Sequence, residues 1–361
     1  MSRLLNVRKS LSQHKFDAFL ISSVSQISYL TDFSNFSREE REGYLLITKK
    51  NNYIFTDGRY TEAVKRQVKN CILVELGRGV SFPKALENIK KKEKIKVVGI
   101  EENDLKVSES HALLRAGLKM KGVSIDSLRV IKENWEIKNI QVAARLGDLT
   151  FNHIIKKLKS GMSEKEVSWE MEQFIKNHGG VLAFESIVAF GKNGSVPHHH
   201  TGGTRLGKKN GDFILLDFGA KVQGHCSDMT RTVSWGKASQ EQKKMYQIVL
   251  GAQKKTEEYI EKNLNREVLA SEADRMARDY IKEKGYSDIP HSVGHGIGLE
   301  VHELPHLSPR SKGVLRSGMV FSIEPGIYVP GFGGVRIEDI YVLEKKRLKR
   351  LTKAPKSFIE I

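Results

Sequence analysis

Five acidic or imidazole side chains lie in short apolar or glycine-rich segments, where solvent-exposed charges are not expected. They are Asp217 in ILLDFGA, Asp228 in HCSDMTRT, His295 in SVGHGIGLEVHE, Glu324 in FSIEPGIY and Glu338 in GGVRIEDI. Four carboxylates on one surface repel one another unless they take up protons or bind cations. Oxygen ligands with one imidazole and no thiolate favour manganese, cobalt, iron or zinc over a soft-metal site. The set therefore predicts a metal centre.

Four carboxylates also suit two ions better than one ion. A carboxylate can bridge two metal ions about 3.5–4 Å apart, which is the usual separation in two-metal hydrolases. An ordinary ion pair or capping contact is the commoner explanation for any one of these residues alone. Only the set as a whole favours a dinuclear centre.

A hairpin could make the two aspartates neighbours. Asp217 ends the apolar run from Phe213 to Phe218, and Asp228 opens a second strand-like run. If the chain reverses near Val222 to Gly224, the two side chains become cross-strand neighbours.

A second hairpin could do the same for the two glutamates. The midpoint between Glu324 and Glu338 falls at Gly331, where glycines in PGFGG permit a tight reversal. His295 lies in GHGIG, whose small neighbours let the imidazole approach closely. Two hairpins and one loop would therefore assemble the set on one sheet face.

The composition describes an ordinary globular protein of about two domains. The chain has 361 residues, of which 39% are hydrophobic. Cys71 and Cys226 lie far apart, so neither a disulfide framework nor a thiolate zinc site is indicated, and a reducing cytoplasm fits best. The N-terminal segment lacks the apolar region of a signal peptide, and no run approaches the roughly 18 apolar residues of a membrane span.

The formal net charge of +17 raises the question of nucleic-acid binding. The lysines are spread along the chain, however, and only residues 90–96 and 345–350 hold clusters. Solvated lysine surfaces are the better explanation, so nucleic-acid binding is disfavoured.

Secondary-structure patterns indicate two domains, at residues 1–133 and 134–361. Short helices and strands alternate in the first part, which predicts an α/β domain. The expected helices there cover residues 4–14, 60–67, 83–91 and 108–118, and the expected strands cover residues 18–22, 44–48, 52–56, 72–75, 96–99 and 123–126.

The second part separates helices from strands, which predicts an α+β domain. A long helix should begin near Trp135, and capping boxes at Ser163 with Glu166 and at Ser239 with Gln242 should begin two others. A further helix is expected over residues 267–284, and glycine-interrupted strands over residues 184–233 and 289–343.

The same segments resemble the pita-bread metallopeptidases, and within them the proline-specific branch of aminopeptidase P and prolidase. LLDFGAKVQGHCSDMTRT, VGHGIGLEVHE, FSIEPGIY and GVRIEDI are similar to that family's successive signatures, and VPHHHT and FTDGRY match as well. The resemblance covers nearly the whole chain. It implies a creatinase-like N-terminal domain followed by a pita-bread catalytic domain. It also implies that the five residues above are dinuclear ligands, with Asp228 and Glu338 bridging.

The resemblance implies roles for further residues. His198 and His302 match histidines that contact the substrate and stabilise the tetrahedral intermediate, and Glu324 is the candidate for moving the water proton. The candidate substrate-binding residues are His291, His306, Tyr328 and Arg336. Arg336 could also hydrogen-bond a metal carboxylate. His199 and His200 are expected to have no catalytic role.

The implied function is a metal-dependent aminopeptidase that hydrolyses the Xaa-Pro bond at the N-terminus of peptides with a hydroxide activated by two divalent ions. Manganese is the first expectation, and cobalt, zinc or iron could replace it. Prolidase-type dipeptidases often carry an arginine after the proline that follows HE, where this chain has His306. That departure favours the aminopeptidase over the alternative, an Xaa-Pro dipeptidase.

Three further functions are weaker candidates. A methionine aminopeptidase usually lacks such an N-terminal domain, and creatinase-like chemistry works without these ligands. A non-catalytic pita-bread binding module would typically have lost ligands that are present here. The expected partners are peptides with proline at the second position and further copies of the chain, as a homodimer or homotetramer.

Overall fold

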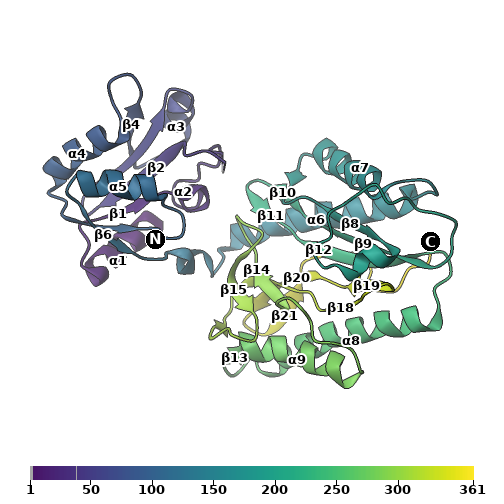
Figure 1. Ribbon diagram of the computed structural model, residues 1–361. Coiled ribbons are helices and arrows are strands. Elements are labelled where there is room, and N and C mark those ends of the chain that lie inside the picture. The colour runs from purple at the N-terminus through teal and green to yellow at the C-terminus, as the bar shows by residue number, and fades with distance from the viewer. Residues whose placement is uncertain (1–2, 38) are drawn as a thin grey trace. The chain divides into compact units, whose positions relative to one another are not determined.

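The computed structural model describes residues 3–37 and 39–361. The chain forms two compact units, Met1–Arg129 and Val130–Ile361 (Figure 1). The division falls a few residues before the boundary expected at Glu133.

The first unit is a six-stranded sheet with helices on both faces, so the expected α/β class is confirmed. The strand order is β4-β3-β2-β1-β5-β6, with antiparallel pairing of β1 with β2 and of β2 with β3, and parallel pairing elsewhere. Its elements are α1 (Arg3–His14), β1 (Ala18–Ile21), α2 (Val24–Thr31), β2 (Gly43–Thr48), β3 (Asn52–Asp57), α3 (Thr61–Gln67), β4 (Ile72–Leu76), α4 (Phe82–Glu93), β5 (Val97–Ile100), α5 (Val107–Arg115) and β6 (Lys119–Gly122).

Two elements of this unit differ from the sequence-based expectations. The strand expected over residues 123–126 is wrong, because α5 ends early, Gly117 adopts a φ of +67°, and β6 begins soon afterwards. Lys119 and Lys121 are exposed on this edge strand, so it carries no hydrophobic pattern. Helix α2 was not expected, although Ser23 accepts a hydrogen bond from the Gln26 N–H as its N-cap.

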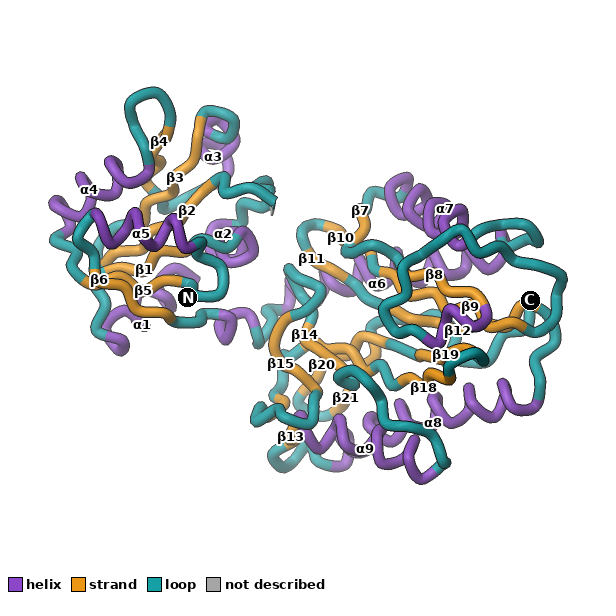
Figure 2. Tube along the Cα trace, viewed as in Figure 1, coloured by secondary structure: helices purple, strands orange, loops and turns teal. Residues whose placement is uncertain are grey.

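The second unit stacks two helix pairs on opposite sides of a set of antiparallel strands. Figure 2 shows α6 and α7 on one side of these strands and α8 and α9 on the other. One apolar core joins α6 and α7 to β8, β9 and β12, and a second joins α8 and α9 to β17, β18, β19 and β20. The helices are α6 (Asn134–Lys157), α7 (Glu164–Asn177), α8 (Gln240–Lys262) and α9 (Ala270–Glu283). The expected α+β class of this unit is confirmed.

The strands of the second unit form two main sheets, a further small three-stranded sheet and two strand pairs. The main sheets have the orders β12-β9-β8 and β15-β14-β17-β20-β21. The strands are β7 (Val181–Leu182), β8 (Ile187–Phe190), β9 (Asp212–Phe218), β10 (Ala220–Val222), β11 (His225–Cys226), β12 (Met229–Trp235), β13 (Val268–Leu269), β14 (Gly294–Gly296), β15 (Glu303–Leu307), β16 (Val314–Leu315), β17 (Val320–Ile323), β18 (Gly326–Val329), β19 (Gly333–Arg336), β20 (Asp339–Glu344) and β21 (Arg347–Arg350).

Helix starts in this unit follow the local sequence signals. Helix α6 begins at Asn134, and both expected capping boxes are present, at Ser163 and at Ser239. Helix α9 begins at Ala270, later than expected, because Val268–Leu269 instead pairs with Val314–Leu315. Helix α1 in the other unit likewise matches its expected range.

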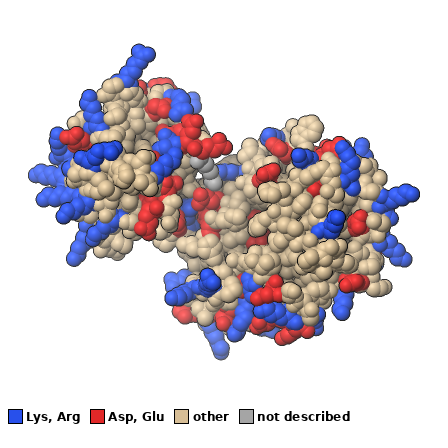
Figure 3. All heavy atoms as spheres, in the orientation of Figure 1, with Lys and Arg blue, Asp and Glu red and all other residues tan. Residues whose placement is uncertain are grey.

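Basic side chains lie mainly at the edges of the second unit. On its visible face, lysine and arginine side chains gather along the lower edge next to acidic side chains, and the middle of the face is mostly free of both (Figure 3). Within the described part of the chain, no helix combines the length and apolar character needed to cross a lipid bilayer.

Candidate metal centre

The antiparallel strands β9 and β12 bring the two aspartates together. Asp217 is opposite Thr230 in the register, and Asp228 lies just before β12, so the aspartates are diagonal rather than direct cross-strand neighbours. The chain reverses at Gln223 and Gly224, which have φ values of +49° and +79°. This is the reversal that the sequence pattern indicated.

The glutamates belong to one continuous antiparallel register. Ile323 pairs with Asp339, and Gly326 pairs with Arg336, so the same register places Glu324 opposite Glu338. The turn lies at Gly331, with a φ of +78°.

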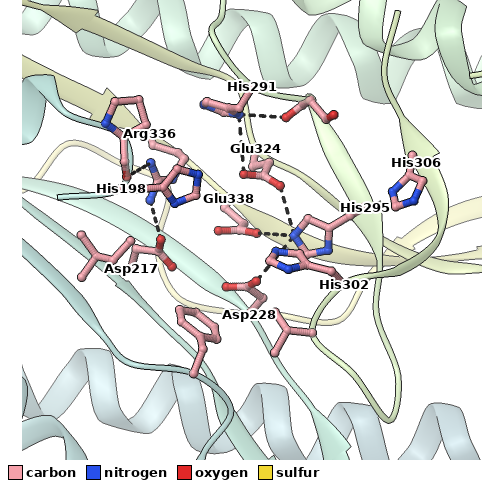
Figure 4. Close-up of a pocket in the computed structure, with 15 residues that line it drawn as sticks. His198, Asp217, Asp228, His291, His295, His302, His306, Glu324, Arg336 and Glu338 are labelled. Carbon is pink, nitrogen blue, oxygen red and sulfur yellow. Dashed lines mark hydrogen bonds and ion pairs between the residues drawn. The ribbon is translucent and has the colours of Figure 1, made fainter. Parts of the chain in front are cut away.

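The two hairpins and β14 converge on one buried cluster (Figure 4). Candidate ligand atoms lie within 4.8 Å of one another in three overlapping groups. These groups are Asp228 with His295 and His302, His295 with Glu324 and Glu338, and Asp217 with Asp228 and Glu338. The structure therefore brings together the five residues singled out from the sequence, and it adds His302 at the edge.

Burial and mutual repulsion shift the protonation of this cluster. Burial, followed by the charge of Glu338, raises the pKa of Asp228 well above its ordinary value. Burial, followed by the charges of Glu324 and Asp217, raises the pKa of Glu338 to about 8. Burial opposes the charged form of His295, but a hydrogen bond and the charge of Glu324 outweigh it and raise that pKa to about 9. The cluster is thus short of positive charge.

Two buried carboxylate oxygens of the cluster are suited to bind cations. Within residues 3–37 and 39–361, Asp228 Oδ1 and Glu338 Oε1 have no hydrogen-bond partner. A buried polar atom without a partner costs about 1–3 kcal/mol. Carboxylate oxygens with one imidazole nitrogen form a suitable donor set for divalent first-row ions. The residues present therefore fit a metal centre.

Polar neighbours fix the orientation of the carboxylates. Thr230 Oγ1 donates to Glu338 Oε2 at 2.7 Å, and Arg336 Nε donates to Thr230 Oγ1 at 3.0 Å. Arg336 Nη2 also donates to Asp217 Oδ2, so the expected contact between Arg336 and a candidate ligand is present. Ser322 Oγ donates to Glu324 Oε1 at 3.1 Å. Such contacts hold ligands in place before an ion binds.

A buried ion pair anchors the strand segment that carries Glu338. Arg231 and Asp339 are both buried, with 2.6 Å between Arg231 Nη2 and Asp339 Oδ1. Arg231 Nη1 donates to the backbone carbonyl of Glu338 at 2.6 Å. Among the described residues Asp339 is the one carboxylate paired with Arg231, so removing Asp339 would leave the Arg231 charge buried without an anionic partner, which is strongly destabilising.

A pocket of about 330 Å³ opens beside the cluster. The other expected site residues that line it are His198, His291, His302, His306 and Arg336. Apolar side chains complete the wall at Phe184, Ile187, Pro197 and Val301.

The histidines reach this pocket from separate elements. The ring centroids of His302 and His295 are 4.4 Å apart, and His306 lies opposite His295 on β15. His291 Nε2 is 2.8 Å from Tyr328 Oη, and Arg336 Nη1 donates to the same oxygen at 2.9 Å. Tyr328 is therefore connected to the pocket by its hydrogen bonds with His291 and Arg336.

Several residues of the centre carry no distinguishing sequence signal. Thr230 and Ser322 are small polar residues on strands, and Phe184 and Val301 are ordinary apolar residues. Only the position of Thr230 in the HCSDMTRT segment could have drawn attention to it.

Comparisons with known proteins identify the family. Residues 138–345 match metallopeptidase family M24, and residues 3–131 match the Creatinase/Prolidase N-terminal domain. The chain belongs to metallopeptidase family M24. It is therefore a peptide-bond hydrolase, and the family implies divalent metal ions. The resemblance found in the sequence and the creatinase-type and pita-bread folds are confirmed.

Similar proteins cover almost the whole chain. An uncharacterized peptidase of Bacillus subtilis is 37% identical over 99% of both chains. The structure of an Xaa-Pro dipeptidase from Bacillus anthracis has a TM-score of 0.92 and 36% identity over 99% of both chains. That of an X-Pro aminopeptidase from Thermotoga maritima has a TM-score of 0.86 and 33% identity, over 96% of this chain and 98% of the other.

Thr230→Val is expected to weaken metal binding by about 10- to 100-fold, the usual effect of losing a contact that orients a ligand. The substitution keeps the shape of the side chain but removes the hydrogen bond to Glu338. Calorimetric titration with Mn²⁺ measures the effect. Thr232→Val is the matched control, because the hydrogen bonds of Thr232 Oγ1 with the described residues go to the backbone of Arg336 and not to a candidate ligand. An equal loss in both variants would contradict the expectation.

Metal affinity of this M24 protein is expected to rise between about pH 6 and about pH 9, because protons compete with the metal for its ligands. Coordination needs Glu338 ionised and His295 neutral. Their pKa values in the metal-free protein are raised to about 8 and about 9, respectively. Protons must therefore leave both groups, and they leave more readily as the pH rises. Mn²⁺ titrations across this range measure the trend, and a pH-independent affinity would contradict it.

Proposed function

We propose that this M24 peptidase hydrolyses the Xaa-Pro bond at the N-terminus of peptides, with two divalent ions, manganese first, as cofactors. The observation that carries the proposal is the buried carboxylate cluster beside a histidine-lined pocket, in which two oxygens accept no hydrogen bond from the described residues. Similar proteins named Xaa-Pro dipeptidase and X-Pro aminopeptidase support the substrate class.

The metal ligands in this proposal are the five clustered residues. The ions would be held by Asp217, Asp228, His295, Glu324 and Glu338. When bound, divalent ions supply a hydroxide nucleophile near neutral pH and polarise the scissile carbonyl.

The remaining steps belong to side chains of the chain. Glu324 accepts the proton of the attacking water and passes it to the leaving proline nitrogen. His198 and His302 line the pocket and donate hydrogen bonds to the oxyanion that forms on the carbonyl.

The other pocket residues bind and orient the substrate. The proline nitrogen of an Xaa-Pro bond carries no hydrogen, so a peptidase that needs an N–H donor there cannot use this bond. The apolar wall at Phe184, Ile187 and Val301 offers contacts for the substrate without requiring that donor. His291, Tyr328 and Arg336 form a connected hydrogen-bonded set at the pocket and orient the peptide.

The direct test is cleavage of Xaa-Pro and Xaa-Pro-Yaa peptides after loading metal-free protein with Mn²⁺, Co²⁺ or Zn²⁺. We expect metal-dependent release of the first residue and faster cleavage of the longer peptides. Full activity after chelator treatment would refute the metal-dependent mechanism. Faster cleavage of the dipeptides would instead establish the alternative, an Xaa-Pro dipeptidase.

His306→Arg is expected to shift the preference toward Xaa-Pro dipeptides by about 10-fold, because a guanidinium can hold their C-terminal carboxylate through two hydrogen bonds. His306 lines the pocket opposite the candidate ligand His295. The ratio of kcat/KM for Xaa-Pro against Xaa-Pro-Yaa measures the shift. His200→Arg adds the same charge at an exposed histidine and should leave the ratio unchanged. An unchanged ratio in His306→Arg would remove His306 from substrate selection.

We also propose that the chain works as a homodimer or homotetramer. Its creatinase-type N-terminal domain supports this expectation. Light scattering on the purified protein measures the mass directly, and a monomer at working concentrations would refute it.

A further inference from the structure

Glu164, at the start of α7, is a fully buried carboxylate that lies outside the metal cluster. Its side chain has 0% exposure. Glu164 Oε1 accepts hydrogen bonds from the Phe190 N–H at 2.9 Å and from Asn193 Nδ2 at 2.8 Å. Glu164 Oε2 accepts from His199 Nε2 at 2.9 Å and from the Gly202 N–H at 2.9 Å. All four donors belong to one segment, residues 190–202.

Helix capping does not account for this arrangement. The N-terminus of α7 is already capped by Ser163 and Glu166, which bond each other's backbone N–H groups. None of the four donors to Glu164 is a lysine or arginine, so this buried charge is compensated by directed hydrogen bonds. Burial opposes its ionisation, but the bonds from Asn193 and His199 and from two backbone N–H groups outweigh burial and lower its pKa.

Further contacts hold the segment that Glu164 binds. Thr201 Oγ1 donates to the Ser186 carbonyl at 2.8 Å and accepts from the Val188 N–H at 2.9 Å. Arg336 Nη1 donates to the Pro197 carbonyl at 3.3 Å. The segment is therefore held by contacts at β8 and with Arg336, in addition to its contacts with Glu164.

His198 lies between two of these fixed points. Pro197, immediately before it, is held by Arg336, and His199, immediately after it, is held by Glu164. The imidazole of His198 points into the pocket beside Arg336 (Figure 4). The backbone turns at Pro197 and His198, so the contacts that hold the residues on either side of His198 also set where its ring enters the pocket.

We propose that Glu164 and His199 are positioning residues that set the location of the His198 imidazole. The proposal rests on the proposed function only for the role of His198 as the oxyanion donor. Geometry matters there, because displacing a catalytic group by about 1 Å can cost on the order of 100-fold in rate. In this arrangement His199 is a positioning residue and is neither a catalytic nor simply a solvent-exposed histidine.

Glu164→Gln tests the proposal in the metal-loaded protein. The substitution preserves shape but replaces one acceptor oxygen with a donor, so two of the four hydrogen bonds are lost. We expect kcat to fall by about 10- to 100-fold, as for other outer contacts of a site. KM and bound metal should change little. Glu172→Gln is the matched control, because Glu172 lies on the same helix and its ion-pair partner among the described residues is the exposed Lys176. Unchanged kcat in folded Glu164→Gln would overturn the proposal.

A double-mutant cycle separates positioning from general destabilisation. If Glu164 acts through His198, then Glu164→Gln should cause no further loss of kcat in a His198→Ala background. Full additivity of the two losses would overturn the proposal.

His199 provides a second test that does not depend on Glu164→Gln folding. His199→Gln places an amide donor near the position of the ring Nε2, so it should keep most of the activity. His199→Ala removes the donor and should lower kcat by about 10-fold or more. Equal activities of the two variants would overturn the role of the Glu164–His199 contact.

Two readouts are independent of activity. Glu164→Gln should speed amide hydrogen exchange at Phe190 or at Gly202, whichever N–H loses its acceptor oxygen, and should shift the NMR signal of the His198 ring, assigned by its loss in His198→Ala. If the wild-type protein cleaved no Xaa-Pro peptide, the proposed function would fail, and these readouts would still decide the positioning role. Exchange rates and a His198 signal identical to wild type would overturn that role.

Discussion

Asp228→Asn should lower the rate of hydrolysis by more than about 100-fold. Changing a residue that only orients a metal ligand already costs up to about 100-fold, and Asp228 is itself a candidate ligand. The same substitution should raise the thermal stability of the metal-free protein. Burial and the charge of Glu338 raise the pKa of Asp228. A carboxylate whose pKa is raised by folding destabilises the folded state above its ordinary pKa. Asparagine removes that buried charge and also removes the anionic ligand, so stability and activity should move in opposite directions.

Metal content, peptidase assays and thermal melts of the metal-free and Mn²⁺-loaded proteins measure these effects. Glu338→Gln should behave in the same way, because its pKa is also raised by burial and by neighbouring carboxylates. Asp212→Asn is the matched control, since Asp212 is exposed at the start of the strand that carries Asp217. Normal metal content and activity in Asp228→Asn would show that the cluster is not the metal centre.

His198→Ala should lower kcat by about 100- to 1,000-fold, because losing one oxyanion donor typically costs about 2.7–4 kcal/mol. His198 lines the pocket beside the cluster, but none of the three candidate ligand groups includes it. Metal content should therefore stay normal. Steady-state kinetics on an Xaa-Pro-Yaa peptide, with metal analysis of the same samples, measure the effect.

The split between kcat and KM distinguishes the possible roles of His198. A rise in KM with unchanged kcat would mean that His198 binds the substrate and the transition state equally. His200→Ala, at an exposed neighbour, should leave both parameters unchanged. His302→Ala should resemble His198→Ala in kcat, and any accompanying loss of metal would reflect the place of His302 in the candidate ligand group with Asp228 and His295.

Local sequence determined much of the fold of this protein. Helix α6 and the capping boxes at Ser163 and Ser239 follow from short-range signals, because an N-cap bond forms within one helical turn. The α/β and α+β classes follow from the order of the elements. Strand β6 could not be predicted in this way, because its exposed lysines give this edge strand no apolar pattern.

The sequence also identified the candidate ligands, because a carboxylate within an apolar strand is unfavourable unless something binds it. Asp217 and Glu338 stand out for this reason alone. The glycine turns at Gly224 and Gly331 then indicated how distant segments could meet, since both positions require a positive φ.

Only the tertiary structure decided which neutral neighbours support the site. Thr230 contacts Glu338 across 108 positions of sequence, and the sequence of either strand contains no trace of that contact. Glu164 resembles an ordinary residue in the first turn of a helix until the fold brings Phe190, His199 and Gly202 to its carboxylate. Residue type and short-range spacing determined which groups needed a partner. Strand register and helix packing chose the partners, because these contacts exist only when distant segments meet.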